Sequence, residues 1–227
     1  ESLAICEKLN LELGTPQSRR DLAVSYRRVG DILRAQRDFT GALEMYQESL
    51  AICEKLNLEL GTPQSRRDLA VSYRRVGDIL RAQRDFTGAL EMYQESLAIC
   101  EKLNLELGTP QSQRDLAVSY DRVGDILKEH RNFTGALKMY CKSLAIDEKL
   151  SHELGTPRAY RDVMIACTNN ASILFDQEKY EEALLFAKRA LTIGETLAAQ
   201  LDTNDARREA EAMRNNLKIV EAYCKKS

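Results

Sequence analysis

The sequence has no tryptophan and only two histidines among its 227 residues. No apolar run approaches the roughly 20 residues that a membrane-spanning helix needs, so we predict no contact with a membrane. Apolar residues make up 44% of the chain and charged residues 30%, a balance typical of globular rather than disordered proteins. The formal net charge of -2 argues against a basic nucleic-acid-binding face, and no nucleic-acid partner is predicted.

Motifs for catalysis and for cofactor binding are absent as well. The chain contains no glycine-rich dinucleotide or phosphate loop, no H-E-x-x-H and no G-x-S-x-G. His130 and His152 fall at or near predicted helix ends, where surface positions are expected, and Cys141 and Cys167 lack C-x-x-C partners. We predict a protein that is not an enzyme and that has no catalytic residue, cofactor or metal.

The six cysteines do not follow the pattern of a small disulfide-rich scaffold. Cys6, Cys53 and Cys100 are equivalent positions of a repeat, so they lie on neighbouring parallel helices. Such helices are separated by about 10 Å, beyond the reach of a disulfide. Reduced thiols and a cytoplasmic location are therefore predicted.

An internal repeat of 47 residues dominates the sequence. The four units start at Glu1, Glu48, Glu95 and Lys142, and the first two units are identical. Each unit has one proline, and these are Pro16, Pro63, Pro110 and Pro157. A period of this length is typical of a solenoid, in which each unit buries its apolar face against its neighbours.

Apolar spacing within a unit is helical. Leu22, Tyr26, Val29 and Leu33 follow the i, i+4, i+7, i+11 pattern of one helix face. The pattern breaks at "RDFTG" and then resumes, which predicts two helices at about 16–36 and 40–60 in the first complete unit. No stretch alternates polar and apolar residues in the manner of a β-strand, so an all-α fold is predicted.

The recurring stretch "ELGTPQSRRDLA" has two interpretations. Gly14 in a left-handed conformation, Thr15 as N-cap and Pro16 at the first helical position would make a joint between helices. The alternative is an anion site at the helix start, with Arg19 and Arg20 nearby. We favour the joint.

The pattern Tyr26, Val29, Gly30, Leu33, Phe39, Ala42, Tyr46 and Ser49 resembles the tetratricopeptide repeat signature, and it recurs in the next two units. With 47 residues in place of 34, the repeat is similar to the extended kinesin light chain type. The resemblance implies a right-handed α–α superhelix of helical hairpins, and Gly30 and Ala42 are small where two helices must approach closely.

We predict a single repeat domain over residues 1–227, in which 1–14 is the second-helix tail of a truncated repeat. The hairpins are expected at 15–61, 62–108, 109–155 and 156–202, with a capping helix at 203–227 that places Lys218 in water. Asn170 replaces the valine of the earlier units and needs a polar partner, such as the backbone. Leu3, Ile5 and Leu9 are expected to be exposed unless another copy covers them.

The resemblance also implies a concave groove, lined by the first helices, that holds an extended peptide or a partner helix. The predicted partner-binding residues are Arg20, Arg27, Arg28, Asp31, Arg34, Arg67, Arg74, Arg75, Asp78, Arg81, Asp121, Arg122, Asp125 and Lys128. The first helices at 16–36 and 63–83 each carry a net charge of +3, whereas those at 110–130 and 157–178 each carry -1. The carboxylate clamp of chaperone-tail receptors is incomplete, because Asp31 and Val118 replace its Asn and Lys.

The leading hypothesis is a non-enzymatic scaffold for protein–protein interaction that binds an acidic or mixed-charge segment. The charges on the first helices differ between the second and the third repeat. The alternative explanation of these differences is sequence drift on a solvated face. Two other functions stay open: a structural repeat that self-associates end to end, and a regulatory or sensor region of a larger protein.

Overall fold

The computed structural model describes residues 2–225, and Glu1, Lys226 and Ser227 lie outside the described residues. Within 2–225 every regular element is an α-helix, as the sequence predicts. The helices are α1 (Ser2–Leu13), α2 (Pro16–Ala35), α3 (Phe39–Leu60), α4 (Pro63–Ala82), α5 (Phe86–Leu107), α6 (Pro110–Glu129), α7 (Phe133–Leu154), α8 (Pro157–Asp176), α9 (Tyr180–Leu201) and α10 (Asn204–Cys224). None of these helices combines the length and the apolar character that crossing a membrane requires.

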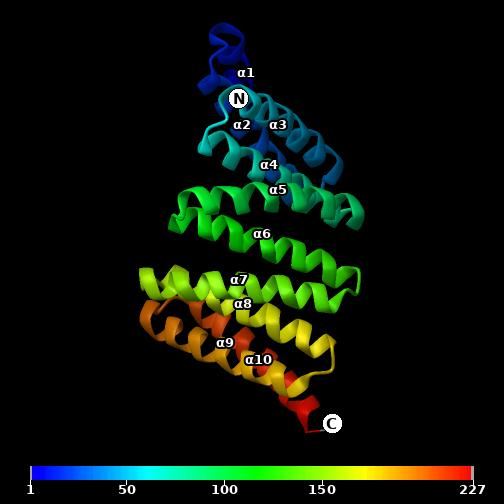
Figure 1. Ribbon diagram of the computed structural model, residues 1–227, viewed down its shortest axis with the longest axis vertical. Helices are drawn as coiled ribbons and strands as arrows, with labels where there is room; N and C mark the ends of the chain where they lie inside the picture. Colours follow the sequence, from blue (N-terminus) through cyan, green and yellow to red (C-terminus); the bar gives the residue numbers. More distant parts are fainter. Residues whose placement is uncertain (1, 226–227) are drawn as a thin grey trace. The chain divides into compact units, whose positions relative to one another are not determined.

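The chain forms two compact units, residues 1–108 and 109–227. Unit 1 contains α1 to α5 and unit 2 contains α6 to α10, and inside each unit helices that follow one another in the chain pack together (Figure 1). Each predicted hairpin contains one pair of helices, whereas the single domain over 1–227 stays a prediction.

The recurring stretch is a joint between helices. Gly14 has φ 56°, a left-handed conformation that glycine adopts without strain, and its backbone N–H donates to the Asn10 carbonyl. Thr15 caps the next helix, because its Oγ1 accepts a hydrogen bond from the Ser18 N–H at 3.1 Å. The same glycine conformation and threonine cap recur at the later joints, so the sequence-based interpretation is confirmed.

The two helices of a hairpin meet at a glycine and a tyrosine. A Cβ atom at Gly30 would lie 2.7 Å from Cε1 of Tyr46, whose side chain is 1% exposed. The Tyr46 hydroxyl donates to Oδ1 of Asp31 at 2.6 Å. Equivalent bonds join Tyr93 to Asp78 at 2.8 Å and Tyr140 to Asp125 at 2.9 Å. The close approach expected at Gly30 is confirmed, and the aspartates on the first helices hold the tyrosines of the second.

The fourth hairpin, α8 and α9, departs from this arrangement. Ala171 stands at the glycine position and Ala187 at the tyrosine position. A cavity of about 220 Å³ lies beside these residues and reaches α10. Asn170 is fully buried and donates to the backbone carbonyls of Ala166 at 2.9 Å and Tyr140 at 3.3 Å, as its position required.

The two ends of the solenoid differ from its interior. Lys218 on α10 is exposed, as expected, and Ile5 on α1 is 58% exposed. Leu9 is 43% exposed, although its repeat equivalent Leu56 is 4% exposed. The expectation for Leu3 was wrong: this side chain is half-buried.

Candidate functional site

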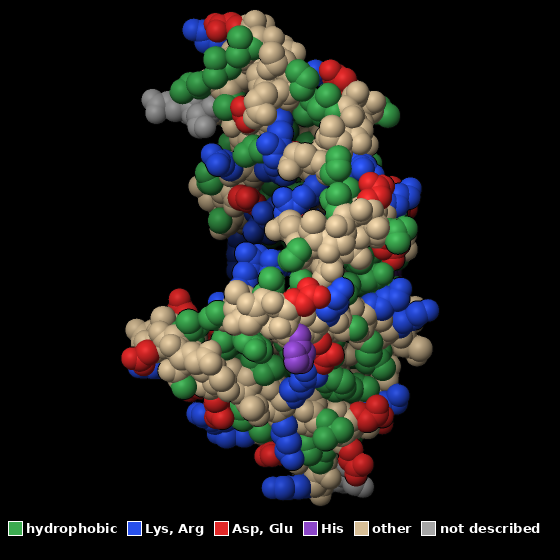
Figure 2. Space-filling model, turned by 60° about the vertical axis from the view of Figure 1, so that its left-hand side comes forward, with side chains coloured by type: hydrophobic (Ala, Val, Ile, Leu, Met, Phe, Trp, Pro, Cys, Tyr) green, Lys and Arg blue, Asp and Glu red, His purple; other side chains and the backbone are tan. Residues whose placement is uncertain are grey.

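The predicted partner-binding residues lie on three first helices, α2 and α4 in unit 1 and α6 in unit 2. Figure 2 shows one face of the molecule, on which Lys and Arg side chains are interspersed with Asp and Glu side chains. Their surroundings divide them into residues that have a partner within the chain and residues that form no ion pair with a described residue.

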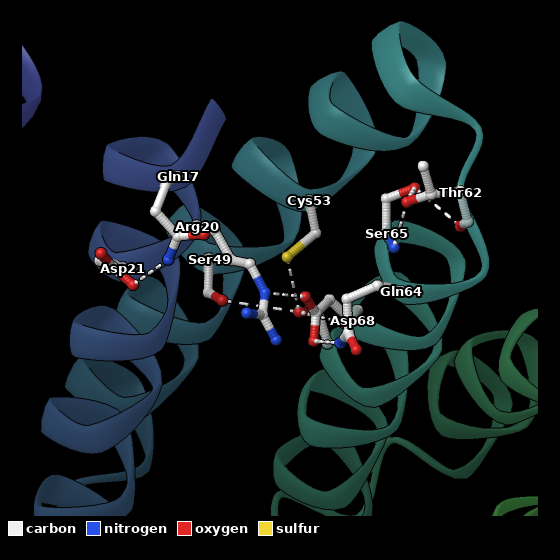
Figure 3. Close-up of polar contacts among 10 residues, drawn as sticks. Gln17, Arg20, Asp21, Ser49, Cys53, Thr62, Gln64, Ser65 and Asp68 are labelled. Carbon is white, nitrogen blue, oxygen red and sulfur yellow. Dashed lines mark hydrogen bonds and ion pairs between the residues drawn. The ribbon is translucent and has the colours of Figure 1, made fainter. Parts of the chain in front are cut away.

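Arg20 belongs to the first group. Its Nε lies 2.6 Å from Oδ2 of Asp68, so the pair joins α2 to α4 (Figure 3). Gln64 donates from Nε2 to the other carboxylate oxygen of Asp68 at 3.1 Å. The hydrogen bond to Asp68 raises the pKa of Arg20, the direction expected for a cation held by a carboxylate. Arg20 therefore fastens one hairpin to the next.

Unit 2 contains the same contact between α6 and α8 and between α8 and α10. Arg114 Nε lies 3.2 Å from Oδ2 of Asp162, and Arg161 Nε lies 2.9 Å from Oε2 of Glu209. In each pair the two residues are 48 positions apart in the chain. The arginine is thus a regular part of the contact between consecutive first helices.

The central charged residues of unit 1 are partly paired too. Arg75 Nη1 lies 3.3 Å from Oδ1 of Asp31, which also accepts the Tyr46 hydrogen bond. Burial, followed by the bond to Asp31, raises the pKa of Tyr46 well above its ordinary value. Asp31 thus has two intramolecular partners.

Three predicted residues of unit 1 have no such partner. The guanidinium groups of Arg27, Arg28 and Arg34 form no ion pair with any residue that the structure describes. Arg28 and Arg34 are exposed and Arg27 is half-buried. Arg67, Arg74, Asp78 and Arg81 each have an interaction, so they are not part of this set. The three arginines, which we call the free arginine group, are the available charges of α2.

In unit 2, two predicted cations are engaged. Lys128 Nζ lies 2.9 Å from Oδ2 of Asp176 and 2.6 Å from the Ser172 hydroxyl. Arg122 lies 3.6 Å from Oδ2 of Asp125 on its own helix. Both cations are therefore neutralised within the unit.

Asp121 of α6 differs from these residues, because it has no ion pair with any residue in 2–225. Its Oδ1 is buried without a hydrogen-bond partner. Burial, followed by the charge of Asp125, raises the pKa of Asp121 to about 7, while the neighbours Ser143 and Asn169 and the charge of Arg122 oppose the rise. The side chain lines a cavity of about 340 Å³ between α6, α7 and α8.

Sequence reasoning missed Asp147, which lines the same cavity from α7. Its side chain is 5% exposed, and burial raises its pKa to about 7, with a further contribution from the charge of Asp121. The sequence does mark this position, since Asp147 stands where the earlier 47-residue repeats have Cys53 and Cys100. A charged residue at a buried position of a repeat marks a place where the environment has changed.

Comparison with known proteins supports the fold. Models of the tetratricopeptide repeat match residues 21–102, 68–149 and 163–198. The crystal structure of BtubC (BKLC) from P. vanneervenii is similar, with a TM-score of 0.66 and 20% identity over 99% of this chain and 88% of that one. The apo form of RapI has a TM-score of 0.68 and 13% identity over 97% of this chain and 86% of RapI. No curated protein gives a significant match. The predicted all-α solenoid class and the resemblance are confirmed.

Proposed function

This chain belongs to the tetratricopeptide repeat family, whose repeats generally mediate protein–protein interaction, and from this premise we propose that its first helices bind an acidic segment of a partner protein. The family is in general a non-catalytic scaffold, and the proposed role needs no chemistry beyond recognition.

The free arginine group is the observation that supports this proposal. A guanidinium without an internal counter-ion keeps its donors for a carboxylate, which it binds in a bidentate, charge-assisted manner. Arg27 and Arg34 are seven residues apart, about two turns or roughly 10 Å along α2, so one extended segment can reach both. Arg28 adds a third positive charge beside Arg27.

Binding of a short fluorescein-labelled peptide in which Glu alternates with Leu tests the proposal by fluorescence anisotropy. A peptide with Lys in place of Glu serves as the charge-reversed probe. We expect the acidic peptide to bind more tightly. Changing Arg27, Arg28 and Arg34 together to Glu should weaken its binding at least tenfold, because three attractive contacts become repulsive.

A matched control carries the same charge change on the second helices. Lys8, Lys55 and Lys102 are exposed repeat equivalents on α1, α3 and α5, and they too are changed to Glu. This control should keep most of the affinity. Equal losses in the two triple variants would mean that only net charge matters and would contradict the assignment to α2.

Self-association has one observation in its favour. Leu9 is 43% exposed where its equivalent Leu56 is 4% exposed, so α1 presents an apolar position that the repeat elsewhere buries. Light scattering across a concentration series tests this second candidate with Leu9→Glu as the variant. A chain that stays monomeric at high concentration, with or without the substitution, would exclude it.

A further inference from the structure

The cavity between α6, α7 and α8 of unit 2 contains more acidic than basic groups. Asp121 and Asp125 come from α6, Asp147 from α7 and Asp162 from α8. The two cations in its wall, Arg114 and Arg122, both come from α6. Four carboxyl groups thus share one cavity with two guanidinium groups.

The two arginines are already matched to two of the carboxylates. Arg114 Nε lies 3.2 Å from Asp162, and Arg122 Nη1 lies 3.6 Å from Asp125. Asp121 and Asp147 are left over, and neither has an ion pair with any residue in 2–225. Asp147 is 5% exposed, and Oδ1 of Asp121 is buried with no hydrogen-bond partner.

Burial of a carboxylate without a counter-ion is unfavourable, and the folded chain keeps two of them facing the same space. Both side chains line the same cavity, and the charge of Asp121 contributes to the raised pKa of Asp147. The carboxyl groups of Asp121 and Asp147 therefore lack a counter-ion, because no cation in the described part of the chain pairs with them.

Unit 1 provides a comparison within the same protein. The positions of Asp121 and Asp147 correspond to Arg27 and Cys53 in the first hairpin. These two also lie near each other, since the charge of Arg27 acts against the burial that raises the pKa of Cys53. At these two repeat positions an arginine and a cysteine are thus replaced by two aspartates, so a positive charge gives way to two carboxyl groups.

We infer that this cavity binds the guanidinium group of an arginine side chain in a partner segment, which bridges Asp121 and Asp147. A planar guanidinium has five donors and is weakly hydrated, so it can serve two carboxylates in a half-closed space. Ala117, Val118 and Ile165 line the same cavity and suit the apolar stem of an arginine. The inference rests on the proposed function. It adds a site for an arginine of the partner in unit 2 to the binding of acidic partner residues by unit 1.

A divalent metal fits this cavity less well than a guanidinium. No group of His, Cys, Asp and Glu residues in the described part of the chain has an arrangement suited to a metal ion. The cavity wall also holds two arginines, whose charges repel a bare cation at short range. A guanidinium spreads its charge over a planar, weakly hydrated group, which reduces this repulsion.

Titration of the isotope-labelled full chain with N-acetyl-arginine methylamide, followed by two-dimensional NMR, tests the inference directly. N-acetyl-citrulline methylamide is the control, because citrulline has the same shape without the charge. We expect the arginine probe to shift amide signals around Asp121, Asp147 and Ile165 in a saturable way, and the citrulline probe to leave them unchanged. Equal shifts with both probes would overturn the inference.

The variant carrying Asp121→Asn and Asp147→Asn removes both charges while keeping the shape of the side chains. It should bind the arginine probe at least tenfold more weakly. Asp205→Asn, on the exposed start of α10, is the matched control in the same unit and should bind normally. Unchanged affinity in the double variant, with a native-like spectrum, would also overturn the inference.

This test separates the inference from the proposed function. The variant with Arg27, Arg28 and Arg34 changed to Glu alters only unit 1 and should keep full affinity for the arginine probe. If the acidic peptide binds and the arginine probe does not, only the inference about unit 2 fails. If the arginine probe binds and the acidic peptide does not, the proposal for unit 1 fails and the cavity in unit 2 stands.

Discussion

The Nε of Arg20 lies 2.6 Å from a carboxylate oxygen of Asp68, which joins the first helices of two consecutive hairpins. Asp68 is buried, whereas Arg20 is partly exposed, so the pair is shielded from solvent mainly on its acidic side. A buried carboxylate that loses its cation is destabilising, because its charge is then compensated only by hydrogen bonds.

Arg20→Gln should therefore lower the free energy of unfolding by about 1 kcal/mol, a value reduced for the exposure of the arginine. Urea denaturation followed by circular dichroism measures the change. Arg28→Gln is the matched control on the same helix and should have no measurable effect, since Arg28 has no ion pair with a described residue. Equal stability of the two variants would show that the Arg20 contact contributes nothing to folding.

A second prediction concerns the coupling of the glycine and tyrosine positions. In the second hairpin, a Cβ atom at Gly77 would lie 2.7 Å from Cε1 of Tyr93, and in the fourth hairpin both residues are alanine, Ala171 and Ala187. Ala187→Tyr alone should destabilise the chain by about 1–3 kcal/mol, because the ring meets the Ala171 methyl group. Adding Ala171→Gly should recover at least about 1 kcal/mol of that loss.

Urea denaturation of the two single variants and the double variant completes this cycle. Ala171→Gly alone is expected to cost about 1 kcal/mol, the usual effect of glycine inside a helix. Strict additivity of the two single effects would contradict the coupling.

A third prediction addresses the joints. Gly61 has φ 56°, and apart from Gly61 and its two chain neighbours no residue has an atom within 4 Å of the place that a Cβ would occupy. The cost of Gly61→Ala is then that of the left-handed backbone alone, about 1 kcal/mol. Gly61→Asn should cost less, because asparagine tolerates this conformation better. Thermal unfolding of both variants measures the difference, and alanine more stable than asparagine would refute the explanation.

The helices and their joints could be predicted from the sequence because their causes are local. Thr15 caps the helix that Pro16 starts, and the apolar spacing that includes Tyr46 has the period of a helix. Each signal also recurs every 47 residues, so chance matches are excluded. The close approach of two helices at Gly30 could also be predicted, whereas the contact with the Tyr46 ring is seen only in the structure.

The candidate site could be predicted less well from the sequence, because the residues that interact in it lie far apart in the chain. Arg20 has the charge and position of a partner-binding residue, but its counter-ion Asp68 comes from the next hairpin, 48 residues later. Asp147 was visible as a departure from the cysteines of the earlier units. Its closeness to Asp121 depends on how α6 and α7 pack, and a sequence pattern does not specify that.

The last prediction is the pH dependence of stability caused by the cavity of unit 2. Burial raises the pKa of both Asp121 and Asp147 from an ordinary value of 3.8 to about 7. The groups that face them are Arg114, Arg122 and Asp125 of α6 and Asp162 of α8. In the folded chain the two carboxyl groups keep protons that the unfolded chain has already lost, so the free energy of unfolding falls as the pH rises from about 4 to about 7.

The variant with Asp121→Asn and Asp147→Asn lacks these two titrations. Relative to the unsubstituted chain, it should gain stability as the pH rises from about 4 to about 7, by up to about 4 kcal/mol for each carboxyl group, because one pKa unit corresponds to about 1.4 kcal/mol. Urea denaturation at several pH values measures the difference, with Asp205→Asn as a variant whose stability should run parallel to that of the unsubstituted chain. If the arginine probe occupies the cavity, adding it at pH above 7 should stabilise the unsubstituted chain and leave the double variant unchanged, because only ionised carboxylates attract the cation. A constant stability difference between the double variant and the unsubstituted chain across this pH range would mean that the two carboxyl groups titrate as they do in the unfolded chain.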